Sequence, residues 1–406
     1  MSEITNQVSD LRNPASDLCP LPSDLRSQSS AINHQSSAEP VKPNRLSAPV
    51  RITDQVWPEG TVPVVSVFCI TYNHVNFIRD AIEGFLMQET TFPVEIFIHD
   101  DASSDGTAEI VKEYAEKYPK LFWTVLQTEN QWSNGNKKIL TDYLQKQRGE
   151  FIALCEGDDF WTSPRKLQEQ VSFLEKNSHY ALSFCNTQVV YTDERYSHAA
   201  YGNHLVPVGY YPVSPPPPET SKTENLSKSN YIHTSGAVLR NWLCSGYLEV
   251  QNYLQKAPVG DYALHLLTSR FGKIKYHPDI MAAYRVHMGG IHSMLPSCRK
   301  ALIEALFFYE TARSSLFDKN LSQVWIERSA KISAEAVIYG AFDGWDGKLT
   351  AMSADAEWVT KFLEEIRIIH QIELKRSENS YRNSASFRFG RSLLKPWHIV
   401  NKWFFK

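Results

Sequence analysis

The chain has 406 residues, of which 42% are hydrophobic and 21% charged, the composition of an ordinary globular protein with a sizeable core. Its net charge is −3, but residues 375–406 hold eight Lys or Arg against one Glu, a local charge of +7 that leaves −10 for the rest. An acidic body excludes a nucleic-acid binder, whose basic residues should cover its working face.

Two kinds of membrane signal are missing from the sequence. No run of 18 apolar residues occurs, and the first residues do not form a basic segment followed by an apolar one. We therefore expect neither a transmembrane helix nor a signal peptide. The six cysteines are scattered without a CxxC pair, and Cys69, Cys155 and Cys185 lie in apolar runs. Buried free thiols in a reducing compartment are the expected state of these three.

Residues 1–60 are rich in Ser, Asn, Gln and Pro and too polar to bury a core, which predicts a disordered leader. Beyond them, apolar runs of strand length alternate with segments of helical spacing. The expected strands are residues 62–73, 94–99, 122–126, 151–155 and 180–191, and the expected helices are residues 77–86, 105–118, 137–147 and 163–174. This order predicts an α/β fold, a mostly parallel sheet flanked by helices and joined by right-handed crossovers.

An acidic loop, residues 156–161 (EGDDFW), lies between the expected strand 151–155 and a helix that should begin with Ser163 as its N-cap. The adjacent carboxylates of Asp158 and Asp159 repel each other and need a cation or strong donors to stay ionised. Hard oxygen ligands suit Mg²⁺ or Mn²⁺. A solvated acidic turn is the plain alternative, but the position at the carboxyl end of a strand favours a ligand site.

Polar residues also end two other expected strands. Tyr72 and Asn73 follow the first strand, and Asp101 follows the second. Because the carboxyl ends of parallel strands meet at one edge of a sheet, these residues and the acidic loop should converge there. The convergence predicts a nucleotide site. No GxGxxG or GxxxxGK[ST] motif occurs near these strands, which counts against dinucleotide-binding and P-loop proteins.

The strand ends resemble those of family 2 glycosyltransferases, which have the GT-A fold. Within residues 63–190, the matching segments are 65–73 (VSVFCITYN), 99–107 (HDDASSDGT) and 156–161 (EGDDFW). The resemblance implies that Thr71, Tyr72 and Asn73 line the nucleotide pocket. It further implies that Asp101 binds the base, Asp158 the ribose, and Asp159 the metal that bridges the diphosphate. Carboxylates accept from the imide N–H of a pyrimidine and from ribose hydroxyls, so a UDP- or dTDP-sugar is the expected donor.

Later segments carry the other site residues that the resemblance implies. His233 should lie beside the donor sugar and acceptor, with a structural histidine as the alternative. Asp261 opens a helix where the family has its catalytic base, and an ordinary N-cap is the alternative. Arg285 and His287 belong to a Tyr-Arg-x-His segment, in which Arg285 can contact phosphate and His287 can bind metal.

The C-terminal part is expected to be helical and then basic. Residues 301–316, 323–339 and 354–372 have helical spacing and should pack on the core or form a homodimer face. The final segment mixes basic residues with aromatic ones, as a membrane-surface segment does, and a docked tail is the alternative. The expected domains are a leader at 1–60, a GT-A domain at 61–295, a helical extension at 296–375 and a basic aromatic tail at 376–406.

Together these features predict a metal-dependent, inverting glycosyltransferase with Mn²⁺ or Mg²⁺ as cofactor. It would move a sugar from a nucleotide diphosphate donor to a hydroxyl of a saccharide or glycolipid. The resemblance implies cell-surface polysaccharide or glycolipid synthesis, in the cytoplasm or peripherally on the inner face of the membrane. A sugar nucleotidylyltransferase shares the acidic metal site, but residues 71–75 lack the glycine-rich basic loop that it needs. A sugar-nucleotide-binding protein without turnover is the alternative from a different class.

Overall fold

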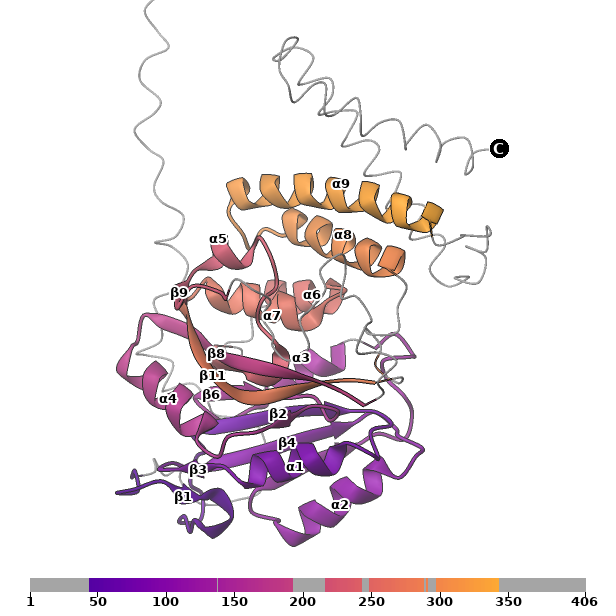
Figure 1. The fold of residues 1–406 in the computed structure, drawn as a ribbon. Coiled ribbons are helices and arrows are strands. Elements are labelled where there is room, and N and C mark those ends of the chain that lie inside the picture. The colour runs from indigo at the N-terminus through magenta and orange to yellow at the C-terminus, as the bar shows by residue number, and fades with distance from the viewer. Residues whose placement is uncertain are drawn as a thin grey trace, which may run out of the picture.

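The computed structural model describes residues 44–136, 138–192, 216–242, 248–287, 290 and 297–342. One large mixed sheet runs through this part of the chain, with helices packed on both faces (Figure 1). Its nine strands follow the order β5-β4-β2-β6-β10-β8-β11-β7, with β9 paired to β11. The expected α/β fold is confirmed.

The N-terminal half of the sheet is parallel. It contains β2 (Val65–Thr71), β4 (Val94–Asp100), β5 (Phe122–Leu126) and β6 (Phe151–Leu154). Thr71, Asp100 and Leu126 lie in register at the ends of β2, β4 and β5. Every residue of β4 is buried, as expected for a strand that helices cover on both faces. The segments that follow these strands therefore leave the sheet at the same edge.

The C-terminal half mixes directions and returns the chain to that edge. Its strands are β10 (Ala237–Arg240), β8 (Tyr180–Tyr191), β11 (Lys273–Val286), β7 (Phe160–Trp161) and β9 (Thr220–Ser221). β10 pairs antiparallel with β6 and β8, whereas β11 runs parallel to β8. β7 forms the last two residues of the acidic loop and pairs antiparallel with β11. This pairing brings the end of β11 beside the acidic loop.

Two apolar layers hold the helices on the sheet. Helices α1 (Ile78–Leu86), α2 (Thr107–Lys117) and α4 (Lys166–Lys176) cover one face, and α3 (Lys138–Leu144), α6 (Leu248–Lys256) and α7 (Gly260–Ser269) the other (Figure 1). The alternation along β6 feeds both layers, because Phe151 and Ala153 pack on the first face and Ile152 and Leu154 on the second.

The expected helical extension is present as α8 (Ser297–Arg313) and α9 (Lys319–Phe342), which lie outside α6 and α7 (Figure 1). A short helix, α5 (Thr223–Leu226), precedes β10. The helix expected at 354–372 and the basic tail fall outside the described residues. Among the described helices, none combines the length and the apolar character needed to cross a bilayer.

Two sequence expectations differ from the structure. Residues 44–60 were expected in the disordered leader, yet β1 (Val50–Arg51) pairs with β3 (Glu89–Thr90), and Ile52 behind it is buried. The helix expected to start at Ser163 instead begins at Lys166 as α4. The main-chain oxygen of Ser163 accepts from the Gln88 side chain at 2.8 Å and from Lys166 N at a longer 3.4 Å, and Pro164 and Arg165 form a turn before α4. The three expected free cysteines, Cys69, Cys155 and Cys185, are buried and unpaired as expected.

Candidate active site

The acidic loop lies against the end of β2. Gly157 N donates to Ile70 O at 2.9 Å, which continues the strand pairing beyond β6. A Cβ at Gly157 would lie 2.5 Å from Thr71 Oγ1 and 2.6 Å from Thr71 Cβ. Only glycine allows this approach, because real Cβ atoms do not come within 3.0 Å of such neighbours. The two strand ends are therefore in direct contact.

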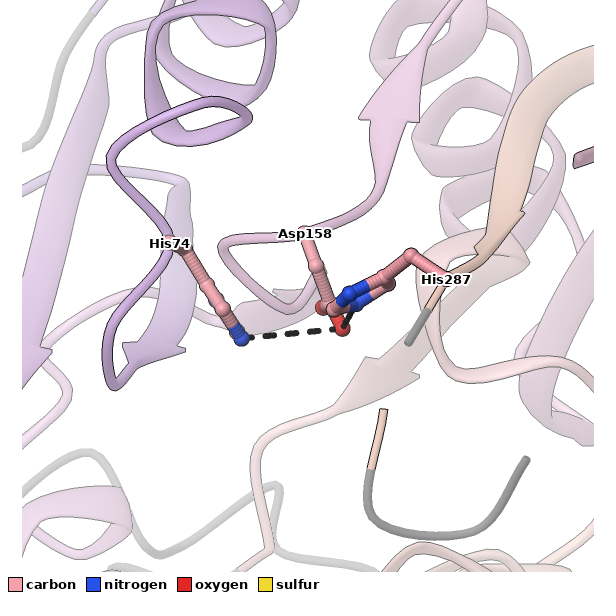
Figure 2. A group of neighbouring side chains, drawn as sticks. All are labelled: His74, Asp158 and His287. Atoms are coloured by element: carbon pink, nitrogen blue, oxygen red, sulfur yellow. Dashed lines mark hydrogen bonds and ion pairs between the residues drawn. The ribbon is translucent and has the colours of Figure 1, made fainter. Parts of the chain in front are cut away.

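Three side chains from separate parts of the chain meet at this contact (Figure 2). His287 Nε2 lies 3.0 Å from Asp158 Oδ2, and His74 Nε2 lies 3.7 Å from the same oxygen. Their ligand atoms all lie within 4.8 Å of one another. Burial acts to raise the pKa of Asp158, but the hydrogen bond from His287 and the two imidazoles outweigh it and lower the pKa below its usual value. Asp158 is thus an ionised carboxylate facing two imidazoles.

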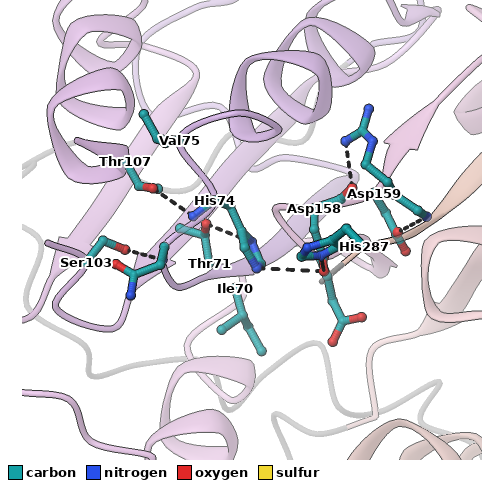
Figure 3. Close-up of polar contacts among 12 residues, drawn as sticks. Ile70, Thr71, His74, Val75, Ser103, Thr107, Asp158, Asp159 and His287 are labelled. Carbon is teal, nitrogen blue, oxygen red and sulfur yellow. Dashed lines mark hydrogen bonds and ion pairs between the residues drawn. The ribbon is translucent and has the colours of Figure 1, made fainter. Parts of the chain in front are cut away.

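The loop that carries His74 is fixed to the neighbouring loop after β4 (Figure 3). The main-chain nitrogen of His74 donates to Thr107 Oγ1 at 2.8 Å, and His74 Nδ1 lies 3.2 Å from Thr71 Oγ1. Asn73 N donates to Ser103 Oγ at 2.8 Å. Asn73 also has a φ of 54°, in the left-handed region that asparagine tolerates better than most residues. These bonds give His74 a defined direction.

Asp101 is engaged with the loop after β5. Its Oδ1 accepts from Gln131 N at 2.8 Å and its Oδ2 from Trp132 N at 3.0 Å. Tyr72 and Trp132 are each 43% exposed beside it. Carboxylate oxygens have further lone pairs, so these bonds leave capacity for another donor. The roles expected for Tyr72, in lining the nucleotide pocket, and for Asp101, in binding the base, stay predictions.

Asp159 occupies a different environment from Asp158. It is fully buried, and its Oδ1 accepts from Arg285 N at 2.9 Å. Its Oδ2 has no hydrogen-bond partner among the described residues and lies 3.7 Å from His233 Nδ1. Burial, together with Asp158 and Glu156, raises the pKa of Asp159 well above its usual value. Asp159 does not belong to the group formed by His74, Asp158 and His287.

The Arg285 side chain holds the acidic loop rather than facing open space. It is 7% exposed, and its Nη1 and Nη2 donate to Asp158 O and Asp80 Oδ2, each at 2.7 Å. The guanidinium lies 4.8 Å from the ring centroid of Phe77 and 4.7 Å from that of Phe160. The phosphate contact expected for Arg285 stays a prediction, and this geometry gives the side chain a positioning role.

Asp261 lies second in α7, and the N-cap position belongs to Val259. The carboxylate accepts a hydrogen bond from Thr234 Oγ1 at 3.2 Å and so faces the segment before β10. Partial loss of hydration raises the pKa of Glu156 to about 8, and the negative charges of Asp158 and Asp261 contribute to this rise. Asp261 is therefore close enough to the acidic loop for its charge to be felt there.

Two histidines are buried near Asp261. Burial lowers the pKa of His233 to about 4, although Asp261 and Asp158 oppose the change. Its Nδ1 accepts from Ser235 N, so a neutral ring carries its proton on Nε2. Burial likewise lowers the pKa of His265 to about 4. Both ring nitrogens of His265 lack a partner among the described residues.

Sequence reasoning did not assign a role to His74, Thr234 or Asp80. His74 follows a strand end in the segment that was assigned to the nucleotide, and that position was the available signal. Thr234 and Asp80 give no comparable sign, because their partners Asp261 and Arg285 lie far along the chain.

The sequence of this chain is similar to those of known proteins. Residues 66–243 match the family model described as Glycosyl transferase family 2. An uncharacterized protein of Mycobacterium tuberculosis is 36% identical over 237 residues, which cover 58% of this chain and 63% of that protein. The chain thus spans less than two thirds of that relative. The putative glycosyltransferase EpsE of Bacillus subtilis is 36% identical over 118 residues, or 29% of this chain and 41% of EpsE.

Two solved structures are similar to this chain at low sequence identity. TarS 1–349 of S. aureus, in complex with UDP-GlcNAc, has 16% identity and a TM-score of 0.45, over 72% of this chain and 78% of that one. The mannosyltransferase PcManGT of Pyrobaculum calidifontis, in complex with GDP-Man and Mn²⁺, has 19% identity and a TM-score of 0.44, over 87% and 92%. The family match rests on the sequence: residues 66–243 of this chain form a glycosyl transferase family 2 domain.

Proposed function

We propose that this protein transfers a sugar, with inversion, from a nucleotide diphosphate sugar to a hydroxyl group of a saccharide or glycolipid. The observation that carries the proposal is that the charges of Asp158, at the edge of the parallel strands, and of Asp261 both act on Glu156 and His233. Asp261 has its Thr234 partner at 3.2 Å and contributes to the electrostatics of Glu156 in the acidic loop. One carboxylate can thus serve the donor while another serves the acceptor.

The donor side uses the edge formed by β2, β4 and β6. Tyr72 offers an exposed ring on which a base can stack, and Asp101 can accept from the base. Thr71 and Asn73 shape the pocket from the end of β2, and Asp158 reaches the ribose or the diphosphate. A pyrimidine nucleotide, as in a UDP- or dTDP-sugar, fits this site because the Asp101 carboxylate can accept from the imide N–H of the pyrimidine. His233 is proposed to present its Nε2–H beside the donor sugar.

Asp261 is the proposed general base. Its carboxylate takes the proton of the acceptor hydroxyl while that oxygen forms a bond to the anomeric carbon. The bond from the anomeric carbon to the phosphate oxygen breaks on the opposite face, and the nucleoside diphosphate leaves. Attack and departure on opposite faces give inversion. Thr234 donates to Oδ2 of Asp261 and thereby leaves Oδ1 for the acceptor.

A divalent cation fits the donor set of the site. The ionised carboxylate of Asp158 and the nearby imidazole of His287 are both ligand types that Mn²⁺ accepts. When bound, such an ion neutralises charge that develops on the departing diphosphate. Asp159 remains a candidate ligand through its unpartnered Oδ2, although the His287 contact is to Asp158.

The setting is proposed to be polysaccharide or glycolipid assembly at the cytoplasmic face of the membrane. The names of two relatives support it, namely EpsE and a putative teichuronic acid biosynthesis glycosyltransferase, TuaG, both from Bacillus subtilis. The charge of +7 in residues 375–406 supports peripheral contact with anionic lipid. Sedimentation with anionic vesicles at low salt, compared with a chain truncated after Tyr381, tests that contact.

A thermal-shift panel of UDP-, dTDP- and GDP-sugars, with and without Mn²⁺, tests the function itself. We expect one nucleotide class to raise Tm, and more so with metal. No shift with any nucleotide would overturn the proposal. Slow hydrolysis of the bound donor by purified protein then separates an enzyme from a protein that only binds nucleotide sugars.

A further inference from the structure

His74 and His287 both approach the same carboxylate oxygen of Asp158, Oδ2 (Figure 2). The two ring centroids are 6.0 Å apart and the ring planes lie at 86°, so the imidazoles meet edge to face. The side chains of His74 and Asp158 are each 16% exposed, and that of His287 is 7% exposed. This is a partly closed site with two imidazoles and one carboxylate.

The separations suit a six-coordinate ion. With metal–ligand distances of about 2.1 Å, neighbouring ligand atoms lie about 3 Å apart and opposite ones about 4.2 Å. The contacts to Asp158 Oδ2 are 3.0 Å from His287 and 3.7 Å from His74, and all three ligand atoms lie within 4.8 Å. Changes of less than about 1 Å in these separations would bring all three atoms onto one ion.

His74 is also held as a ligand should be. Its Nδ1 lies 3.2 Å from Thr71 Oγ1, and a hydroxyl oxygen beside one ring nitrogen leaves the other to bind metal. Its main-chain nitrogen donates to Thr107 Oγ1 at 2.8 Å, so His74 is held both through its main chain and through its ring. The side chain is therefore oriented before any ion binds.

We propose that His74 is a third protein ligand, with Asp158 and His287, for the divalent ion of the proposed transfer reaction. The inference rests on that function. It also predicts which ions the site prefers. Imidazole is a common ligand of transition ions, which bind nitrogen with affinities that rise from Mn²⁺ through Co²⁺, whereas Mg²⁺ prefers oxygen ligands and keeps its waters. Two imidazoles thus make this a site for a transition ion, with Mg²⁺ a weak substitute.

The competing interpretation is that the two histidines only hold the Asp158 carboxylate by hydrogen bonds. Both interpretations predict that loss of Asp158 harms the site. They differ on nitrogen ligation, because only a coordinated imidazole couples its ¹⁴N nuclei magnetically to bound Mn²⁺.

The test is titration of purified protein with MnCl₂ or MgCl₂, each with and without UDP, followed by pulsed electron paramagnetic resonance of the Mn²⁺ complex. For the unsubstituted protein we expect tighter binding of Mn²⁺ than of Mg²⁺ and a signal from two coordinated imidazoles. His74→Asn should weaken Mn²⁺ at least tenfold and reduce the signal to one imidazole. His74→Asp should narrow the preference for Mn²⁺ over Mg²⁺.

His179→Asn, at an exposed histidine remote from the acidic loop, is the matched control and should change neither affinity nor spectrum. Far-ultraviolet circular dichroism and Tm establish that each variant is folded. Two coordinated imidazoles retained in folded His74→Asn, or Mn²⁺ affinity within twofold of the unsubstituted protein, would overturn the inference. Nucleotide binding that Mn²⁺ does not strengthen would overturn it while leaving sugar transfer standing, whereas absence of nucleotide binding would remove the proposed function as well.

Discussion

Arg285 donates a hydrogen bond from its side-chain Nη1 to the main-chain oxygen of Asp158, at a distance of 2.7 Å. Its main-chain nitrogen meanwhile donates to Oδ1 of Asp159. Arg285 of β11 therefore holds both neighbouring aspartates. It binds Asp158 at the main-chain oxygen of that residue and Asp159 at the side-chain carboxylate. Because His287 lies two residues further on, the same strand end also sets the distance between His287 and Asp158.

Arg285→Lys tests this positioning role. Lysine keeps the charge but cannot donate to Asp158 O and Asp80 at once or present a flat face to the two aromatic rings. We expect the affinity for Mn²⁺ with UDP to fall roughly ten- to a hundredfold, as for other groups that orient metal ligands. Calorimetric titration measures the change.

The control for that substitution is Arg79→Lys. Arg79 pairs with Glu113 at 2.8 Å, but both side chains are at least half exposed, and such pairs contribute only about 0–1 kcal/mol. It should leave metal affinity unchanged. If Arg285→Lys behaves like Arg79→Lys, Arg285 does not position the site.

Gly157→Ala should damage the site by crowding. The added Cβ would lie 2.5 Å from Thr71 Oγ1, so the acidic loop or the end of β2 must move. Overpacking of this kind costs about 1–3 kcal/mol, which urea denaturation can measure. Gly260→Ala is the control, since nothing lies within 4 Å of its Cβ and alanine favours a helix. Equal stabilities of the two variants would contradict the close approach.

The sequence could predict the parallel half of the sheet because β2, β4 and β6 are mostly apolar, and polar residues end each strand or follow it. Parallel strands buried on both faces leave that pattern, and their shared edge follows from the topology. The sequence therefore predicts that the residues after β2 and β4 converge with the acidic loop, and the register of Thr71 with Asp100 and the bond from Gly157 N to Ile70 O agree with this.

The partners within the site could not be read in the same way. Asp158 and Asp159 are adjacent and chemically identical, but the turn sends one toward His287 and buries the other against Arg285 N. That separation depends on β7 pairing with β11, more than 100 residues later in the chain. Order at Ile52 was missed for a similar reason, since its burial depends on β1 pairing with β3.

The buried histidines predict how stability depends on pH. Burial lowers the pKa of His265 to about 4, from an ordinary value of 6.5. Between these values the unfolded chain takes up a proton that the folded protein excludes, so acidification favours unfolding. The free energy of unfolding should fall by about 1.4 kcal/mol per pH unit for each such histidine. Above pH 7 this loss is absent.

His265→Leu isolates one of these protons. Both ring nitrogens lack partners among the described residues, so leucine removes no hydrogen bond found there. Urea denaturation between pH 7 and pH 5 should show a slope smaller by about one proton than in the unsubstituted protein. Other groups, such as Glu156 and His233, titrate in both proteins and cancel in the comparison. Parallel slopes would mean that His265 is protonated in the folded state.

Asp261→Asn separates catalysis from structure. Asparagine keeps the size of the side chain and can still accept from Thr234, but it cannot take a proton. Donor affinity depends on the opposite edge of the site and should stay within a few-fold. The transfer rate should fall by roughly 10²–10⁴, the usual contribution of a general base. A helix-capping role offers no competing explanation for such a loss, because Val259 occupies the N-cap.

Asp279→Asn, at an exposed acid on β11, serves as the control and should keep full activity. The measurement is transfer rate and donor affinity in all three proteins. If Asp261→Asn transfers sugar within a few-fold of the unsubstituted rate, the proton goes to another group, and Glu156, beside Asp158 with a pKa of about 8, becomes the next carboxylate to test.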